Sequence, residues 1–103
     1  MTRWSPFRFP AIDIRVDLVA VNESERRIRF GSCKRSPASL LSDVNHFKQH
    51  VERFLRSLPK YETWTRDYVG IATRLDAEHR VVLAADGIIP QDLADLTVGL
   101  DYE

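Results

Sequence analysis

The chain has 103 residues, of which 44% are hydrophobic and 29% charged, a composition that supports one folded domain over residues 1–103 and excludes a compositionally disordered chain. It has no apolar run of about 18 residues and no basic segment followed by an apolar one, so we expect no membrane span and no secretion signal. Its single cysteine cannot form an internal disulfide, which favours a cytoplasmic location.

The formal net charge is zero, but charge is unevenly distributed along the chain. Residues 1–60 hold twelve Lys/Arg and six Asp/Glu, whereas residues 61–103 hold three and nine. A basic half can contact phosphates. Two oppositely charged halves can equally pack together and neutralise each other, and the pattern alone leaves both interpretations open.

Two strands joined by a turn are predicted near the N-terminus. Residues 1–11, rich in proline and aromatic residues, form an irregular lead-in. Residues 12–21 alternate with a period of two, which predicts a strand with Leu18 and Ala20 on its apolar face and Asp17 on the other. Residues 22–25 form a turn. Residues 26–34 are predicted to form a second strand, one face of which carries Ile28, Phe30, Ser32 and Lys34.

The period then changes to that of a helix. Apolar residues at spacings of three and four predict an amphipathic helix over 40–58, capped by Ser39 or Ser42 and ended by Pro59. Residues 68–73 read as a buried strand, and 76–86 as a short helix, although Val81-Val82 would also suit a strand. Residues 88–89 predict a last short strand and 90–93 a helical turn. We expect an α/β domain with a small mixed sheet.

The two strands bring chemically suggestive residues to one face. Hydrolysis of a phosphodiester with Mg²⁺ uses carboxylate ligands, and a neighbouring lysine can orient water and neutralise developing charge. Residues two apart on a strand share a face, so an acid-x-Lys element delivers both groups to one side. Here Asp17 lies on the first strand and Ser32-Cys33-Lys34 on the second. A loop centred on Glu23-Ser24 would place Asp17 opposite Phe30, on the face of Ser32 and Lys34.

These residues resemble the PD-(D/E)xK nuclease superfamily, which has the restriction-endonuclease-like fold. The segments "VDLVA" at 16–20 and "FGSCK" at 30–34 resemble the pattern "IDLVA … FGECKW" of the nuclease-like domain that follows archaeal-type P-loop ATPases. The resemblance runs from about residue 14 to 96 and includes "GIIPQDLADL". It implies a small mixed sheet flanked by helices in the order β-β-α-β-α-(β)-α, a Mg²⁺ cofactor on Asp17 if the domain is active, and a P-loop ATPase as partner.

The chain departs from this pattern in three ways. Ser32 replaces the acidic ligand, and a serine hydroxyl is a weak Mg²⁺ ligand. Arg35 replaces a frequent tryptophan. We also expect the helix that normally precedes the sheet in this family to be missing, which would leave apolar sheet surface uncovered and invite a homo-oligomer or a partner chain.

Several other residues have a functional and an ordinary interpretation. Asp13, Asp43 or Glu52 could replace the lost carboxylate, but surface polar residues of a helix or strand explain them more simply. His46 and His50 lie one helical turn apart, without a third metal ligand at a recognisable spacing. Cys33 is expected to be a small buried core residue. The aromatic residues that could stack on bases, or simply close the core, are Trp4, Phe7, Phe9 and Trp64.

The sequence thus supports three functions. The first is a catalytically degenerate nuclease-like domain that contacts nucleic acid or protein, with phosphate contacts from Arg27, Arg29, Lys34, Arg35 and Lys48. The second is a live Mg²⁺-dependent DNA endonuclease that uses Asp17, Lys34 and a relocated carboxylate. The third is a protein-interaction module in which Asp17 and Lys34 form an ordinary ion pair.

Overall fold

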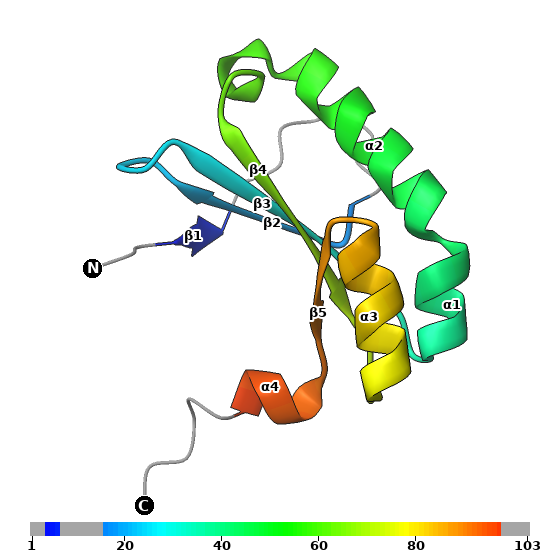
Figure 1. Ribbon diagram of the computed structural model, residues 1–103. Coiled ribbons are helices and arrows are strands. Elements are labelled where there is room, and N and C mark those ends of the chain that lie inside the picture. The colour runs from blue at the N-terminus through cyan, green and yellow to red at the C-terminus, as the bar shows by residue number, and fades with distance from the viewer. Residues whose placement is uncertain (1–3, 7–15, 98–103) are drawn as a thin grey trace, which may run out of the picture.

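The computed structural model describes residues 4–6 and 16–97 and shows a small α/β domain (Figure 1). The strands of its mixed sheet stand in the order β1-β2-β3-β4-β5, with antiparallel pairs up to β3 and parallel pairs from β3 to β5. The strands are Ser5–Pro6, Leu18–Asn22, Arg27–Cys33, Thr65–Ile71 and Ile88–Gln91. The helices are Pro37–Ser42 (α1), Val44–Ser57 (α2), Ala77–Ala85 (α3) and Leu93–Thr97 (α4), with a 3-10 turn at Pro59–Tyr61. The expected α/β class with a small mixed sheet is confirmed.

The β2–β3 hairpin closes through a four-residue loop, residues 23–26. The Asn22 side-chain oxygen accepts hydrogen bonds from Ser24 Oγ at 2.9 Å and from the backbone N–H of Glu25 at 3.1 Å. Arg26 takes a left-handed conformation with φ of 51°, which returns the chain into β3. This local network sets the position of the turn.

The turn lies one residue later than the sequence analysis predicted, and the strand register differs accordingly. Leu18 pairs with Gly31 and Val19 with Phe30. Asp17, which precedes β2, therefore falls in line with Ser32 and not opposite Phe30. Because a shift of two residues leaves each side chain on its face, the predicted common face survives this correction.

The prediction of which face of β2 is buried was wrong. Val19 and Val21 are 6% and 8% exposed and pack into the core, whereas Leu18 is 51% exposed. Both faces of this strand carry apolar residues, so alternation alone does not say which faces the helices. Pairing with Phe30 and Ile28, which are fully buried, decides it.

The predicted single helix is divided at Asp43 into α1 and α2. Ser36 caps α1, because its hydroxyl accepts a hydrogen bond from the N–H of Ser39 at 3.2 Å, and Pro37 opens it. The predicted caps, Ser39 and Ser42, lie inside α1. The α2 helix packs one apolar face against the sheet, and the buried residues of this face are Val44, Phe47, Val51, Phe54 and Leu55.

The second half of the chain follows the prediction for α3 and departs from it at β4 and β5. The β4 strand begins at Thr65 and ends at Ile71, whereas the predicted strand covered residues 68–73. Asp76 caps α3, and Gly87, with φ of 76°, follows its end. β5 continues through Pro90 to Gln91, which is permitted because this strand lies at the sheet edge. The α4 helix consequently begins at Leu93 instead of at residue 90.

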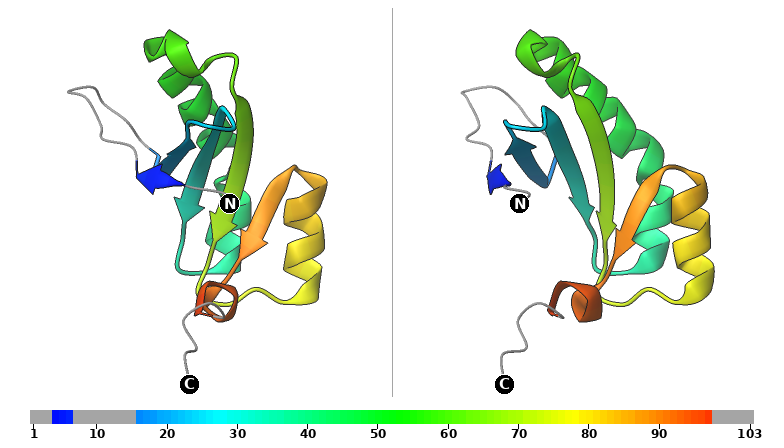
Figure 2. Two further views of the ribbon diagram at one scale, coloured as in Figure 1. Left: turned by 90° about the vertical axis from the view of Figure 1, so that its left-hand side faces the viewer. Right: turned by 60° about the vertical axis from the view of Figure 1, so that its left-hand side comes forward.

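The core lies between the sheet and the layer formed by α1, α2 and α3 (Figures 1 and 2). The Phe30 ring meets the Phe54 ring edge-on at 5.3 Å between centroids. The side chains of Ile88 and Leu40 pack closely against the backbone at Gly70. A Cβ at this position would lie 3.0 Å from Ile88 Cγ2 and 3.2 Å from Leu40 Cδ2. The residues of α1, β4 and β5 therefore pack around a position without a side chain.

No described helix covers the opposite face of the sheet, which we call the open face (Figure 2). Strand alternation places nine side chains on it: Leu18, Ala20, Arg27, Arg29, Cys33, Asp67, Val69, Ile71 and Ile89. Helices were expected to flank the sheet. In the described part of the chain they cover one of its two faces.

Candidate functional site

The predicted motif residues gather at the carboxyl end of β3. Lys34 directly follows this strand and its N–H bonds to the carbonyl oxygen of Ile71 at 2.9 Å. Asp17 comes from the start of β2, and its Oδ2 accepts a hydrogen bond from the backbone N–H of Cys33 at 2.8 Å. Asp17 and Lys34 thus belong to one small region. The carboxylate of Asp17 is engaged with the main chain at the motif itself.

Ser32 is enclosed between the sheet and the helices. It is 3% exposed and follows Phe30 on the buried face of β3. A hydroxyl in this position is shielded from solvent and has no charge to attract a metal ion. The position at which the resemblance predicts an acidic ligand therefore belongs to the core.

A second carboxylate lies beside Lys34. Asp43, at the break between α1 and α2, has Oδ2 3.6 Å from Lys34 Nζ and Oδ1 3.7 Å from His46 Nδ1. Asp43 is one of the carboxylates predicted as possible replacements, and the structure brings it to the lysine. Residues 4–6 and 16–97 nevertheless contain no group of three His, Cys, Asp or Glu side chains arranged to hold a metal ion. This finding also covers the His46–His50 pair.

Glu52 does not reach the motif. It pairs with the guanidinium of Arg66 near the start of β4. Arg66 stands in register with Ile28, six residues before Lys34, and six residues of strand span about 20 Å. Asp13, the other predicted replacement, lies outside the described residues.

The predicted phosphate-contacting residues do not form one surface. Arg27 and Arg29 lie on the open face, and each donates a hydrogen bond to Asp67, at 2.8 and 3.2 Å. Asp67 raises the pKa of the Arg27 guanidinium through this hydrogen bond and through its charge. Lys48 lies in the helix layer, where Nζ donates to the carbonyl oxygen of Asp86 at 2.7 Å.

Two exposed arginines remain at the carboxyl edge of β3 and β4. Arg35 follows Lys34, and together with Thr73 they line a pocket of about 360 Å³. Arg74 lines an adjoining pocket with Pro37 and with the Asp76–His79 pair. Neither arginine forms an ion pair with another described residue. Sequence analysis missed Arg74, because a single arginine after a strand has no distinguishing spacing.

Cys33 is exposed and not buried as predicted. Strand alternation turns it to the open face, at the rim of the pocket that Lys34 lines. Partial burial of the sulfur and the charge of Asp17 raise the pKa of the thiol, and Lys34 opposes them. A raised pKa favours the protonated thiol over the nucleophilic thiolate.

The predicted aromatic residues have separate roles. Trp4 lies under the guanidinium of Arg29, whose Cζ is 4.5 Å from the ring centroid. Trp64 is in the core and meets Tyr61 edge-on at 4.8 Å. Phe7 and Phe9 lie outside the described residues.

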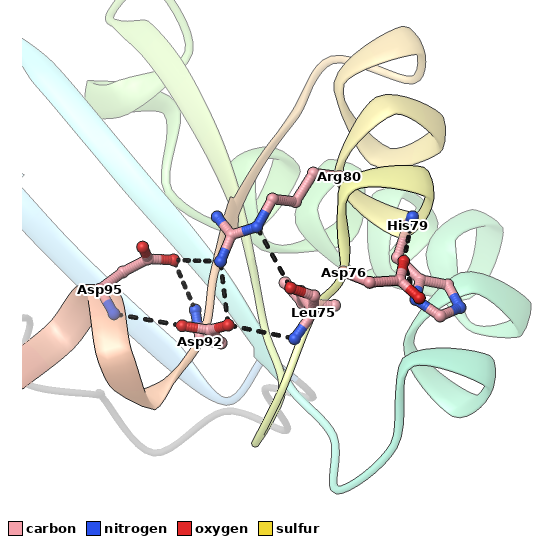
Figure 3. Close-up of polar contacts among 6 residues, drawn as sticks. All are labelled: Leu75, Asp76, His79, Arg80, Asp92 and Asp95. Carbon is pink, nitrogen blue, oxygen red and sulfur yellow. Dashed lines mark hydrogen bonds and ion pairs between the residues drawn. The ribbon is translucent and has the colours of Figure 1, made fainter.

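Hydrogen bonds and ion pairs also connect the start of α4 to Leu75, in the loop before α3, and to Arg80 on α3 (Figure 3). Asp92 Oδ1 accepts the N–H of Asp95, and Asp95 Oδ2 accepts the N–H of Asp92, which is a reciprocal capping box. Asp92 Oδ2 also accepts hydrogen bonds from the N–H of Leu75 at 3.1 Å and from Arg80 Nη2 at 2.9 Å. The signal for this cluster was present in the sequence as Asp-x-x-Asp before an apolar turn.

The Asp92 cluster should make stability depend on pH. The hydrogen bonds from the N–H groups of Leu75 and Asp95, with the charge of Arg80, hold the pKa of Asp92 below its ordinary value of 3.8. A lowered folded pKa stabilises the fold above the ordinary value and loses this effect as pH falls through the folded pKa. We expect Asp92→Asn to lower the free energy of unfolding near neutral pH, with a deficit that shrinks on acidification below pH 3.8.

Urea unfolding at a series of pH values measures this deficit. Glu62→Gln, which removes one exposed carboxylate beside the 3-10 turn, is the matched control. A deficit for Asp92→Asn that stayed constant across the acid range would contradict the assignment.

Among the described residues, no helix has both the length and the apolar character needed to cross a membrane. Comparisons of the chain with protein-family models, curated proteins and solved structures found no match.

Proposed function

We propose that this domain is a catalytically degenerate, nuclease-like module that contacts the phosphate backbone of nucleic acid without cutting it. One observation carries the proposal: the acid-x-Lys position is occupied by the enclosed Ser32, while Asp17 and Lys34 remain together at the end of β3. Lys34 is held by Asp43 and Asp17 by the main chain. The described part therefore keeps a lysine and a carboxylate of such a site but offers no complete set of metal ligands.

The carboxyl edge of β3 and β4 is the surface that best suits phosphate contact. Arg35 and Arg74 are exposed there, and Lys34 lies between their loops and Asp43. Arginine side chains at a strand end can reach a phosphate without moving a buried group. The arginines of the open face are less suited, because Asp67 already neutralises part of their charge.

Binding should be weak, sensitive to salt and independent of base sequence. Three phosphate contacts give a slope of log K against log salt of about −2 to −3 on duplex DNA. Arg35→Ala and Arg74→Ala should each weaken binding and reduce the slope by about one. Fluorescence anisotropy of a labelled duplex, titrated at several salt concentrations, measures both quantities.

Arg53→Ala is the matched control, since Arg53 is an exposed arginine on α2, away from this edge. Absence of binding at low salt would reject the proposal. So would binding that Arg53→Ala weakens as much as Arg35→Ala does.

A second candidate, an active Mg²⁺-dependent DNA endonuclease, is favoured by the 3.6 Å approach of Asp43 to Lys34. In this case Asp17 and Asp43 would hold the metal and Lys34 would position the attacking water. Plasmid DNA incubated with Mg²⁺ or Mn²⁺ separates the two functions. Cleavage that is lost in both Asp17→Ala and Asp43→Ala would establish the second function and overturn the first.

A further inference from the structure

Backbone hydrogen bonds hold the residues that follow β3, β4 and β5 together at one edge of the sheet. The N–H of Lys34 donates to the carbonyl oxygen of Ile71 at 2.9 Å, and the N–H of Leu93 donates to that of Thr73 at 3.4 Å. Asp92, whose carboxylate bonds to the loop before α3, fixes the start of α4 at this edge (Figures 2 and 3). The carboxyl ends of parallel strands are the usual ligand-binding edge of an α/β sheet, and here they are set in place before a ligand arrives.

The pocket of about 360 Å³ at this edge has a polar side and an apolar side. Lys34, Arg35 and Thr73 supply two cationic groups and a hydroxyl. Ile71 and Leu93 form the apolar side, and Leu93 is 54% exposed. The described residues that line this pocket include no carboxylate. This combination suits a ligand that joins an anionic group to a part with apolar surface.

The charges at the pocket favour a phosphate as the anionic group. Asp43 lies 3.6 Å from Lys34 and neutralises part of its charge, whereas Arg35 is exposed and forms no ion pair with another described residue. A guanidinium group can donate two parallel hydrogen bonds to a phosphate. Arg35 therefore supplies the unmatched charge of the pocket, as the proposed contact with nucleic acid requires.

We propose that this pocket receives one unpaired nucleotide of a nucleic-acid strand, with its phosphate at Arg35 and Lys34 and its base or sugar against Leu93 and Ile71. A duplex presents its phosphates and keeps its bases stacked inside, so it cannot use the apolar side, whereas an unpaired nucleotide exposes its base. The volume lies at the lower end of the range of about 300–1,000 Å³ for small-molecule pockets, which fits one nucleotide. This inference rests on the proposed function and names the ligand of the same site.

Fluorescence anisotropy with three labelled probes of equal length tests the proposal: a single strand of thymidines, the same strand with abasic sites in place of its bases, and a duplex. The first two carry the same phosphates, so we expect the thymidine strand to bind about threefold or more tightly than the abasic strand at the same salt concentration. Leu93→Ser should abolish this difference, and Arg35→Ala should weaken binding of all three probes. Val82→Ser changes an apolar residue that is 45% exposed on α3 and should preserve the difference.

Circular dichroism establishes that each variant is folded, and methyl NMR of the wild type needs no substitution. The methyl signals of Leu93 and Ile71 should shift with the thymidine strand and less with the abasic strand, and those of Val82 should not shift. Equal affinity of the wild type for these two strands would overturn the inference and leave the proposed function intact. So would free thymidine monophosphate that binds as tightly as the strand. Absence of binding to every probe at low salt would instead reject the proposed function, and the inference with it.

Discussion

Replacing Ser32 with glutamate is expected to destabilise the domain without metal and to make its melting temperature rise with added Mg²⁺ or Mn²⁺. Position 32 is 3% exposed, so an ionised carboxylate there is desolvated, and Lys34 offsets this cost only in part. We expect Tm to fall by about 10 °C or more. The carboxylates of Asp17 and Asp43 lie near the same strand end and can complete a set of oxygen ligands.

Bound metal stabilises the folded state by mass action, by about 2.7 kcal/mol when its concentration is a hundred times the dissociation constant. Thermal unfolding of wild type, Ser32→Glu and Ser32→Gln, each with and without metal, measures the effect. The glutamine variant has the same size and no charge. If glutamate and glutamine variants respond equally to metal, position 32 does not face a latent metal site, and the nuclease-like proposal loses its main support.

Asp67→Ala is expected to lower Tm by about 5–15 °C, because one carboxylate serves two arginines on the open face. Asp67 is 8% exposed, whereas the Arg27 and Arg29 side chains are 41% and 37% exposed. Without Asp67 both guanidinium groups can turn partly toward water, so the loss is smaller than for a wholly buried pair. Repulsion between the two arginines remains.

A double-mutant cycle isolates this interaction. Combining Asp67→Ala with Arg29→Met should cost less than the sum of the two single changes, since the carboxylate and guanidinium are then removed together. Glu62→Ala serves as the exposed-carboxylate control. If the Asp67→Ala variant has the same Tm as the Glu62→Ala control, this cluster adds nothing to stability.

The hairpin, the amphipathic helix and α3 were predictable because each has a local signal. Strand alternation, apolar residues three and four apart, and the Asp76 cap all act within a few residues. The face of β2 was not predictable in this way. Leu18 and Val19 are both apolar, and only the long-range pairing with Phe30 decides which of them is buried.

The candidate site was predictable in its members but not in its contacts. The prediction that Asp17 and Lys34 lie at the same strand end holds, because the observed register differs from the predicted one by two residues and such a shift leaves each side chain on its face. The pairing of Lys34 with Asp43 depends on the break between α1 and α2, which the continuous apolar periodicity of residues 40–58 concealed. The division of the basic residues among three surfaces depends on tertiary packing, which a count of charges does not contain.

The positions of the loops that carry Lys34, Arg35 and Arg74 depend on the small size of Gly70. Leu40 of α1 and Ile88 of β5 both press on the place where its side chain would begin. The loop that carries Lys34 and Arg35 enters α1, and the loop that carries Arg74 leaves β4. An added methyl group would act as a wedge on both loops at once. The spacing between Lys34 and the arginines Arg35 and Arg74 therefore depends on the absence of a Cβ at position 70, a residue outside the loops that carry them.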